Sequence, residues 1–138
     1  MIVLDTHTWI WLLNGDEKIK KSGYLDIIKK NIKDHTIFIP AISLWEVSML
    51  VAKERIILSE NTLDWVKKAS SAPGMSVYPL SPEVAYESTI LPGDFHGDPA
   101  DRMIIATARV LNATLLTFDK EIIKYASKGF VNIIKSIK

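Results

Sequence analysis

Short runs of apolar and β-branched residues alternate along the chain with longer segments in which apolar residues recur at helical spacing. Runs with the length and composition of β-strands occupy residues 2–4, 36–39, 77–80, 114–118 and 130–134. Helices are predicted at 9–13, 18–32, 43–53, 61–70 and 81–91, from 98 to 108, and around 125–126. This alternation is typical of an α/β fold with a mostly parallel sheet covered on both faces.

Local signals mark several ends of these elements. Asp98 followed by Pro99 predicts a helix start, with a side-chain acceptor at the N-cap and proline at the first helical position. Ser43 and Glu46 have the spacing of a capping box, which predicts that a helix begins there. Pro79 indicates an edge strand or a strand end, because proline cannot donate to a sheet ladder.

Length and composition narrow the class of protein. The 138 residues, of which 48% are apolar, are expected to form a single domain, 1–138. A net charge of +1 lacks the basic excess of many nucleic-acid-binding domains. The absence of cysteine excludes disulfides and thiolate metal sites. With neither a signal-peptide pattern nor an apolar run of about 20 residues, the sequence predicts a soluble, cytoplasmic protein without a membrane segment.

One acid stands out within the stretch HGDPADRMIIATA. The helix start at Asp98 puts Asp101 one turn into the helix, at the head of an apolar row through Ile104, Ile105 and Ala108. A carboxylate on the core-facing side of a helix needs a partner, and no lysine or arginine lies on this row. The alternative is that the acid only complements the helix N-terminus.

Three further acids fall at equivalent places in the predicted fold. Asp5 and Asp119 each follow a strand, and Glu46 and Asp101 each lie near the start of a helix. Strand ends and the helix starts that follow them share one edge of a parallel sheet, so all four are expected at one rim. Capping can explain each acid alone. It explains the set less well, because two carboxylates ~4 Å apart repel by about 4 kcal/mol at an effective dielectric constant of about 20.

Acids gathered in this way predict a cation. Oxygen ligands without cysteine favour Mg²⁺ or Mn²⁺ over zinc. His7, His35 and His96 lack the spacing of a zinc site, and a loop or surface role is expected for each. A divalent ion in such a site lowers the pKa of a bound water and neutralises charge on a phosphate, which indicates a metal-dependent nuclease or phosphatase.

The sequence resembles the PIN domain, and within that family the VapC-type toxin ribonucleases of toxin–antitoxin systems. The resemblance rests on four segments that occur in order: LDTHTWIW, SLWEVSML, LPGDFHGDPADRMIIATA and LLTFDKEI. It implies a three-layer α/β/α sandwich with a mostly parallel sheet. It also implies an endoribonuclease in which water activated by Mg²⁺ or Mn²⁺ cleaves RNA.

The resemblance further implies which residues form the site. The acids that hold the metal and act in catalysis would be Asp5, Glu46, Asp101 and Asp119. Asp98 is expected to cap its helix first and to contact the metal second. Thr6 and Thr117 would hold a carboxylate or a metal-bound water. Arg102 would pair with an acid or a phosphate, and a structural pairing is favoured.

Toxins of this kind usually form homodimers and are inhibited by a cognate antitoxin. The antitoxin would pack in an apolar groove beside the acids, and plain core packing is the alternative for each groove candidate: Trp9, Trp11, Trp45 and Met49. RNA phosphates would be steered by exposed basic residues, although most lysines on helix faces are only solvated. The candidates are Lys18, Lys20, Lys21, Lys29, Lys30, Lys53 and Arg55.

Two other classes of protein share parts of this pattern. A receiver domain or a haloacid-dehalogenase-like phosphatase also places an aspartate at a strand end. The receiver needs paired acids after its first strand, and the phosphatase needs Asp-x-Asp, whereas this chain has the single acid Asp5 there. A non-catalytic binding protein on the PIN fold is the other alternative, which the retention of four acids disfavours.

Overall fold

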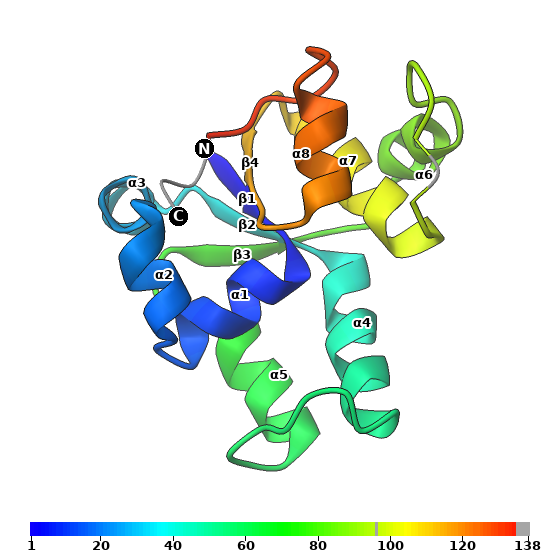
Figure 1. Ribbon diagram of the computed structural model, residues 1–138. Helices are drawn as coiled ribbons and strands as arrows, with labels where there is room; N and C mark the ends of the chain where they lie inside the picture. Colours follow the sequence, from blue (N-terminus) through cyan, green and yellow to red (C-terminus); the bar gives the residue numbers. More distant parts are fainter. Residues whose placement is uncertain (96, 135–138) are drawn as a thin grey trace.

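The computed structural model describes residues 1–95 and 97–134 (Figure 1). Within them a parallel sheet has the strand order β3-β2-β1-β4. Its strands are β1 (Ile2–Leu4), β2 (Ile37–Pro40), β3 (Met75–Tyr78) and β4 (Thr114–Leu116). The predicted α/β class with a parallel sheet is confirmed.

Helices connect the strands and cover the sheet. In chain order they are α1 (Thr6–Leu13), α2 (Glu17–Ser22), α3 (Leu25–Asp34), α4 (Ala41–Ala52), α5 (Thr62–Ser70), α6 (Pro82–Thr89), α7 (Pro99–Leu111) and α8 (Lys120–Ala126). Among the described residues, no helix combines the length and the apolar character that a membrane crossing requires.

Alternation of side chains along the strands divides the core between the two faces of the sheet. Ile2 and Leu4 of β1 pack with Trp9 of α1, whereas Val3 packs with Ile104 of α7. All five side chains are at most 1% exposed. Helices α1 to α5 contribute to the first cluster and α6 to α8 to the second, and Figure 1 shows α1, α2 and α5 across the sheet from α6, α7 and α8. The layers are therefore α/β/α.

The path of the chain reverses between β1 and β4. From β1 the chain adds β2 and then β3 on one side, and its connecting helices cover the first face. It then returns over the opposite face, through α6 and α7, and places β4 on the other side of β1. Ligands of parallel α/β sheets bind outside the carboxyl ends of the strands at such a reversal. Asp5, after β1, and Asp119, after β4, occupy this place.

The prediction of a single helix at 18–32 is wrong. The segment forms two helices, α2 and α3, and α2 ends at Gly23, which has φ +84°. Glycine adopts this left-handed conformation without a steric penalty and so ends the helix. β3 begins earlier than predicted, at Met75, and it lies at an edge of the sheet, as Pro79 indicates.

The strand predicted at 130–134 does not form. The segment makes one isolated parallel bridge, between Ile133 and Leu115 of β4. Val131 is 7% exposed and packs in the cluster beneath α7 and α8. The apolar residues of this segment thus complete the core without extending the sheet.

The capping box predicted at Ser43 is also wrong. β2 leads directly into α4, which begins at Ala41 with Pro40 in the N-cap position and no side-chain cap. Ser43 therefore lies inside the first turn, where its hydroxyl accepts a hydrogen bond of 2.9 Å from Thr6. Glu46 is correspondingly in the second turn of α4 and not at its start.

We expect Thr8→Val to stabilise the protein. Thr8 of α1 is fully buried, and its hydroxyl has no hydrogen-bond partner among the described residues. Valine has nearly the same shape and removes the cost of burying that hydroxyl, about 1 kcal/mol or more. The measurement is the urea midpoint at unchanged m-value.

Thr6→Val is the matched control for this substitution. The Thr6 hydroxyl donates to Ser43 in the buried interior, so the same change leaves that partner unsatisfied and should destabilise by about 1 kcal/mol. A Thr8→Val variant that loses stability as Thr6→Val does would contradict the expectation.

Candidate metal centre and active site

One threonine joins the ends of β1 and β4. The buried Thr117 hydroxyl donates to Asp5 Oδ2 at 2.6 Å, and it accepts from the backbone N–H of Asp119 at 3.0 Å. The other oxygen of Asp5, Oδ1, accepts from the N–H of Thr6 at 2.8 Å. Asp5 and Asp119 are thereby fixed at the same edge of the sheet.

Several of the acids cap helices. Asp5 caps α1, Asp98 caps α7 through the N–H of Asp101 at 2.9 Å, and Asp119 caps α8. Capping therefore accounts for the occurrence of these residues at three helix starts. It does not account for Glu46 or Asp101, which lie inside α4 and α7 and cap neither helix.

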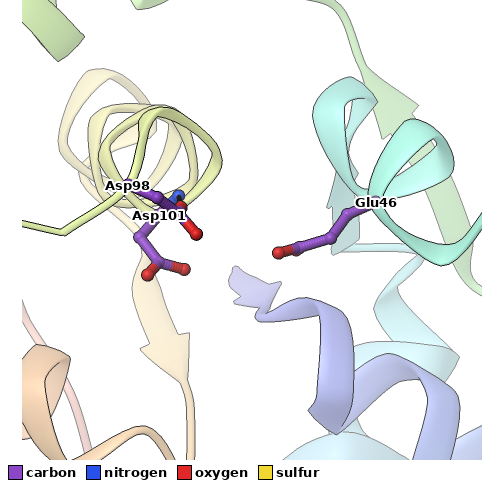
Figure 2. A group of neighbouring side chains, drawn as sticks. All are labelled: Glu46, Asp98 and Asp101. Carbon is purple, nitrogen blue, oxygen red and sulfur yellow. Dashed lines mark hydrogen bonds between the residues drawn. The ribbon is translucent and has the colours of Figure 1, made fainter. Parts of the chain in front are cut away.

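The two acids that are not caps gather with Asp98. Glu46 extends from α4 toward the start of α7, from which Asp98 points toward it and Asp101 lies beside Asp98 (Figure 2). Each of these residues offers one carboxylate oxygen, and the three oxygens lie within 4.8 Å of one another. Asp98, which the sequence predicts as a cap first and a metal ligand second, thus belongs to a group of three acids that could hold a metal ion.

Burial and mutual repulsion disfavour ionisation of Asp101, Asp5 and Glu46. The pKa of Asp101 is raised to about 8, first by burial and then by the charges of Asp98, Asp5, Asp119 and Glu46. Burial likewise raises the pKa of Asp5, against the hydrogen bonds that it receives. The pKa of Glu46 is also raised, chiefly by burial. The carboxyls are therefore close enough to act on one another electrostatically.

No side-chain cation balances these charges within the part of the chain that the structure describes. None of its ion pairs includes an acid of the site. Arg102, next to Asp101, donates instead to the backbone carbonyls of Ser88 at 2.8 Å and Phe95 at 2.6 Å. Its pairing is structural and ties the start of α7 to α6 and to the preceding loop. The oxygen-only donor set and its unbalanced negative charge fit a hard divalent cation such as Mg²⁺ or Mn²⁺.

Two cavities adjoin the acids. The larger, about 460 Å³, is lined by Asp101 and Asp119 and also by Lys124 and Lys128 of α8 and the turn after it. The second, about 350 Å³, lies between α4 and the start of α7. It is mainly apolar, and its lining includes Glu46 and Asp98 and the side chains Ile42, Trp45, Met49 and Pro99.

The basic residues predicted to contact RNA lie away from these cavities. Lys18, Lys20, Lys21, Lys29, Lys30, Lys53 and Arg55 are all exposed, and none lines either cavity described above. Lys18 and Lys21 line a separate cavity with Trp11 and Phe118. Sequence reasoning missed Lys124 and Lys128. The two lysines follow Asp119 and are four residues apart, a spacing that places side chains on one side of a helical segment. That spacing is the signal that would have found them.

The groove candidates divide into three groups. Trp9 is a core residue, 0% exposed, with its indole N–H donating to the carbonyl of Ala69, so the alternative of plain core packing holds for it. Trp11 lines the separate cavity near Phe118. Trp45, which is 56% exposed, and Met49 line the apolar cavity beside the acids.

The histidines have separate surroundings. His7 is exposed near the start of α1, where it only partly opposes the burial that raises the pKa of Asp5 and of Glu46. His35 is the exposed C-cap residue of α3. His96 lies outside the described residues. The expected surface role therefore fits His7 and His35.

Comparison with known proteins gives consistent matches. Residues 2–128 match the PIN domain family. The chain is 30% identical over 123 residues to Ribonuclease VapC22 of Mycobacterium tuberculosis, with 88% of each chain covered.

Solved structures agree in fold. VapBC2 from Rickettsia felis, bound to a DNA fragment from its promoter, has a TM-score of 0.70 at 22% identity, with 97% of this chain and 98% of that chain covered. A toxin–antitoxin complex from Klebsiella pneumoniae has a TM-score of 0.64 at 18% identity, with 98% and 97% covered. The three-layer α/β/α sandwich is thus shared with both.

We expect Asp101→Asn to stabilise the metal-free protein at neutral pH. The folded chain keeps the Asp101 proton up to about pH 8, whereas an unfolded chain loses it near pH 3.8. In the wild type, the contribution of Asp101 to the free energy of unfolding is therefore fully present below about pH 4 and is lost as the pH rises through 8. Asparagine cannot ionise, and solvent screening of a partly buried group leaves a gain of about 1–2 kcal/mol at pH 7.

Chemical denaturation in EDTA across pH 4 to 8 measures this difference. The gap between Asp101→Asn and wild type should open as the pH rises. A gap of constant size over the whole range would show that the substitution acts through packing and not through ionisation.

Proposed function

The chain belongs to the PIN-domain family, in its VapC-type toxin group, and from this premise we propose that it is a metal-dependent endoribonuclease. The observation that carries the proposal is the gathering of Asp5, Glu46, Asp98, Asp101 and Asp119 at the reversal of the sheet without a balancing side-chain cation among the described residues. The curated relative is named a ribonuclease. RNA is therefore the substrate that we propose.

The acids would hold Mg²⁺ or Mn²⁺. Such an ion, when bound, supplies Lewis-acid activation of water and neutralises charge on the phosphate. Asp5 is oriented for this role before any ligand binds, because Thr117 and the N–H of Thr6 fix both of its oxygens. Each oxygen keeps a second lone pair for a ligand. Asp98 spends one oxygen on the helix cap and still contributes to the group with Glu46 and Asp101.

Asp101 would couple ion binding to pH. Its carboxyl keeps a proton to about pH 8 because of burial and of the neighbouring acids. That proton must leave before the carboxylate can act as a ligand, so the affinity for a divalent ion should rise with pH over the neutral range. The site therefore favours activity at neutral to slightly alkaline pH.

The larger cavity supplies a path for RNA next to the acids. Lys124 and Lys128 lie on its wall, and neither takes part in an ion pair found among the described residues. Lysine side chains at this place would bind backbone phosphates beside the cleaved bond. They would position the strand without taking part in the chemistry.

The apolar cavity is the place that we propose for an antitoxin. A structure similar to this chain is a toxin–antitoxin complex. Trp45 and Met49 form an apolar surface directly beside Glu46 and Asp98, and a helix or strand laid on it would also cover the acids. Binding there would inhibit the enzyme by obstruction. The expected homodimer stays a prediction, which sedimentation of the purified chain would test.

We expect the purified protein to cut a mixed single-stranded RNA pool with Mg²⁺ or Mn²⁺ and not with EDTA. Asp5→Asn and Asp101→Asn should abolish cutting, because each removes a charged ligand while keeping the shape of the side chain. Thr117→Val should lower cutting by about 10–100-fold, because it removes the hydrogen bond that orients Asp5. Gel analysis of end-labelled RNA measures all of them.

Asp64→Asn, an exposed acid on α5, serves as the matched control and should cut like wild type. Circular dichroism establishes that each variant is folded. If folded, partner-free wild type cuts no RNA in either metal, the nuclease is excluded for that pool, and a binding role or a very narrow substrate becomes the better account.

We expect Lys124→Gln and Lys128→Gln to raise KM several-fold with little change in kcat, because each removes ground-state binding of a phosphate. Each should also reduce the slope of log affinity against log salt by about 0.7, the value for one contact to a single strand. Lys67→Gln, on the exposed side of α5, is the control. An unchanged KM and slope would exclude these lysines from the RNA path.

A further inference from the structure

A third, smaller cavity lies where α1, α2 and the end of β4 meet. It measures about 280 Å³ and is lined by Trp11, Lys18, Lys21 and Phe118; we call it the aromatic cleft. The Trp11 and Phe118 rings lie 5.1 Å apart between centroids, tilted by 56°. The Lys18 ammonium lies 4.6 Å from the centre of the Trp11 ring. Two aromatic faces and two cations thus share one depression.

Two residues connect the lining of the aromatic cleft to the acidic site. Phe118 and Asp119 are consecutive, so their Cα atoms are about 3.8 Å apart. His7 lies 5.9 Å from Trp11 between ring centroids, and it follows Asp5 by two residues in the first turn of α1. The lining of the cleft is therefore close in the chain to the two acids that follow β1 and β4.

The aromatic side of the cleft is well packed, whereas its two lysines are exposed to solvent. Tyr24 packs edge-on against Phe118 with centroids 5.3 Å apart, and its hydroxyl donates to the carbonyl of Thr117 at 3.0 Å. Lys18 is 59% exposed, and its ion pair with Asp16 is long, at 3.8 Å. Lys21 is exposed and enters none of the ion pairs found within the described residues.

We propose that the aromatic cleft binds one unpaired nucleotide of the RNA substrate, next to the cleaved bond. This inference rests on the proposed nuclease function. A base would stack on Trp11 and Phe118, since every base has a π-face that stacks on aromatic rings. Lys18 would leave the ring, on its flexible stem, and bind the adjoining phosphate together with Lys21.

The proposal identifies the substrate as single-stranded RNA. Bases in a duplex are already stacked on their neighbours and cannot enter the cleft without unpairing. Core packing alone accounts less well for these residues, because Trp11 and Phe118 remain partly exposed and Lys18 lies over the Trp11 ring. The combination of stacking rings and exposed cations is the chemistry that single-strand binding uses.

The test measures binding apart from cleavage. A short, end-labelled single-stranded oligoribonucleotide is titrated with Asp101→Asn protein, which keeps the RNA intact, and followed by fluorescence anisotropy at several salt concentrations. Adding the Trp11→Leu substitution to the Asp101→Asn protein should weaken RNA binding by roughly tenfold. It should leave the slope of log affinity against log salt unchanged. Trp11→Phe, which keeps a stacking ring, should restore most of the affinity.

For the lysines, the quantity expected to change is the slope of log affinity against log salt. Lys18→Gln and Lys21→Gln should each lower the salt slope by about 0.7. Lys67→Gln on α5 should leave affinity and slope at the parent values. The same RNA annealed into a duplex should bind more weakly to the parent, and its binding should not respond to Trp11→Leu.

The outcomes separate this inference from the nuclease itself. If wild type cuts RNA while adding Trp11→Leu to the Asp101→Asn protein leaves its affinity for the oligoribonucleotide unchanged, the aromatic cleft is excluded and the nuclease stands. If wild type cuts no RNA, the nuclease fails, and the cleft is then judged by binding alone. If Trp11→Leu loses a protein partner but no affinity for RNA, the cleft is a protein-docking surface and the proposal is overturned.

Discussion

The Thr117 hydroxyl links the ends of β1 and β4 by donating to Asp5 and accepting from the N–H of Asp119. The rest of the site depends on this link, because β1 and β4 are neighbours in space but are separated by most of the chain. Buried hydrogen bonds to a carboxylate are strong and directional. They leave Asp5 with one orientation, and they fix the edge to which the second turn of α4 and the first turn of α7 bring their own acids.

The same edge is electrostatically unfavourable without a ligand. Two carboxylates about 4 Å apart repel by about 4 kcal/mol at an effective dielectric constant of about 20. A helix N-terminus stabilises a nearby carboxylate by only about 0.3–1 kcal/mol. The structure tolerates the crowding because α7 is anchored beneath Asp101 by Ile104 and Ile105, both fully buried. Packing thus holds the acids together, and a proton or a cation relieves the repulsion, as the raised pKa of Asp101 indicates.

Features encoded within a few residues were predictable from the sequence. Asp98 and Pro99 begin α7 as predicted, and β1 occupies the predicted residues, because caps and short strands depend on local chemistry. Contacts between distant segments were not. The sequence left Trp9 open between a groove and the core, and what places it in the core is its contact with Ala69, 60 residues away. At Ser43 the local capping pattern does not form a cap, because β2 leads directly into α4 and the helix therefore starts two residues earlier.

The acids as a set were accessible to sequence reasoning for a related reason. In a parallel sheet the strand ends share an edge whatever the side chains are, so a topology inferred from alternation is enough to bring Asp5 and Asp119 together. The surfaces around the acids follow no such rule. Phe118 and Asp119 are adjacent in sequence but face different cavities, one aromatic and one lined by Lys124. On the proposed function, an RNA strand that spans both would pass Asp119, so the fold itself would place the cleaved phosphate between a base contact and a phosphate contact.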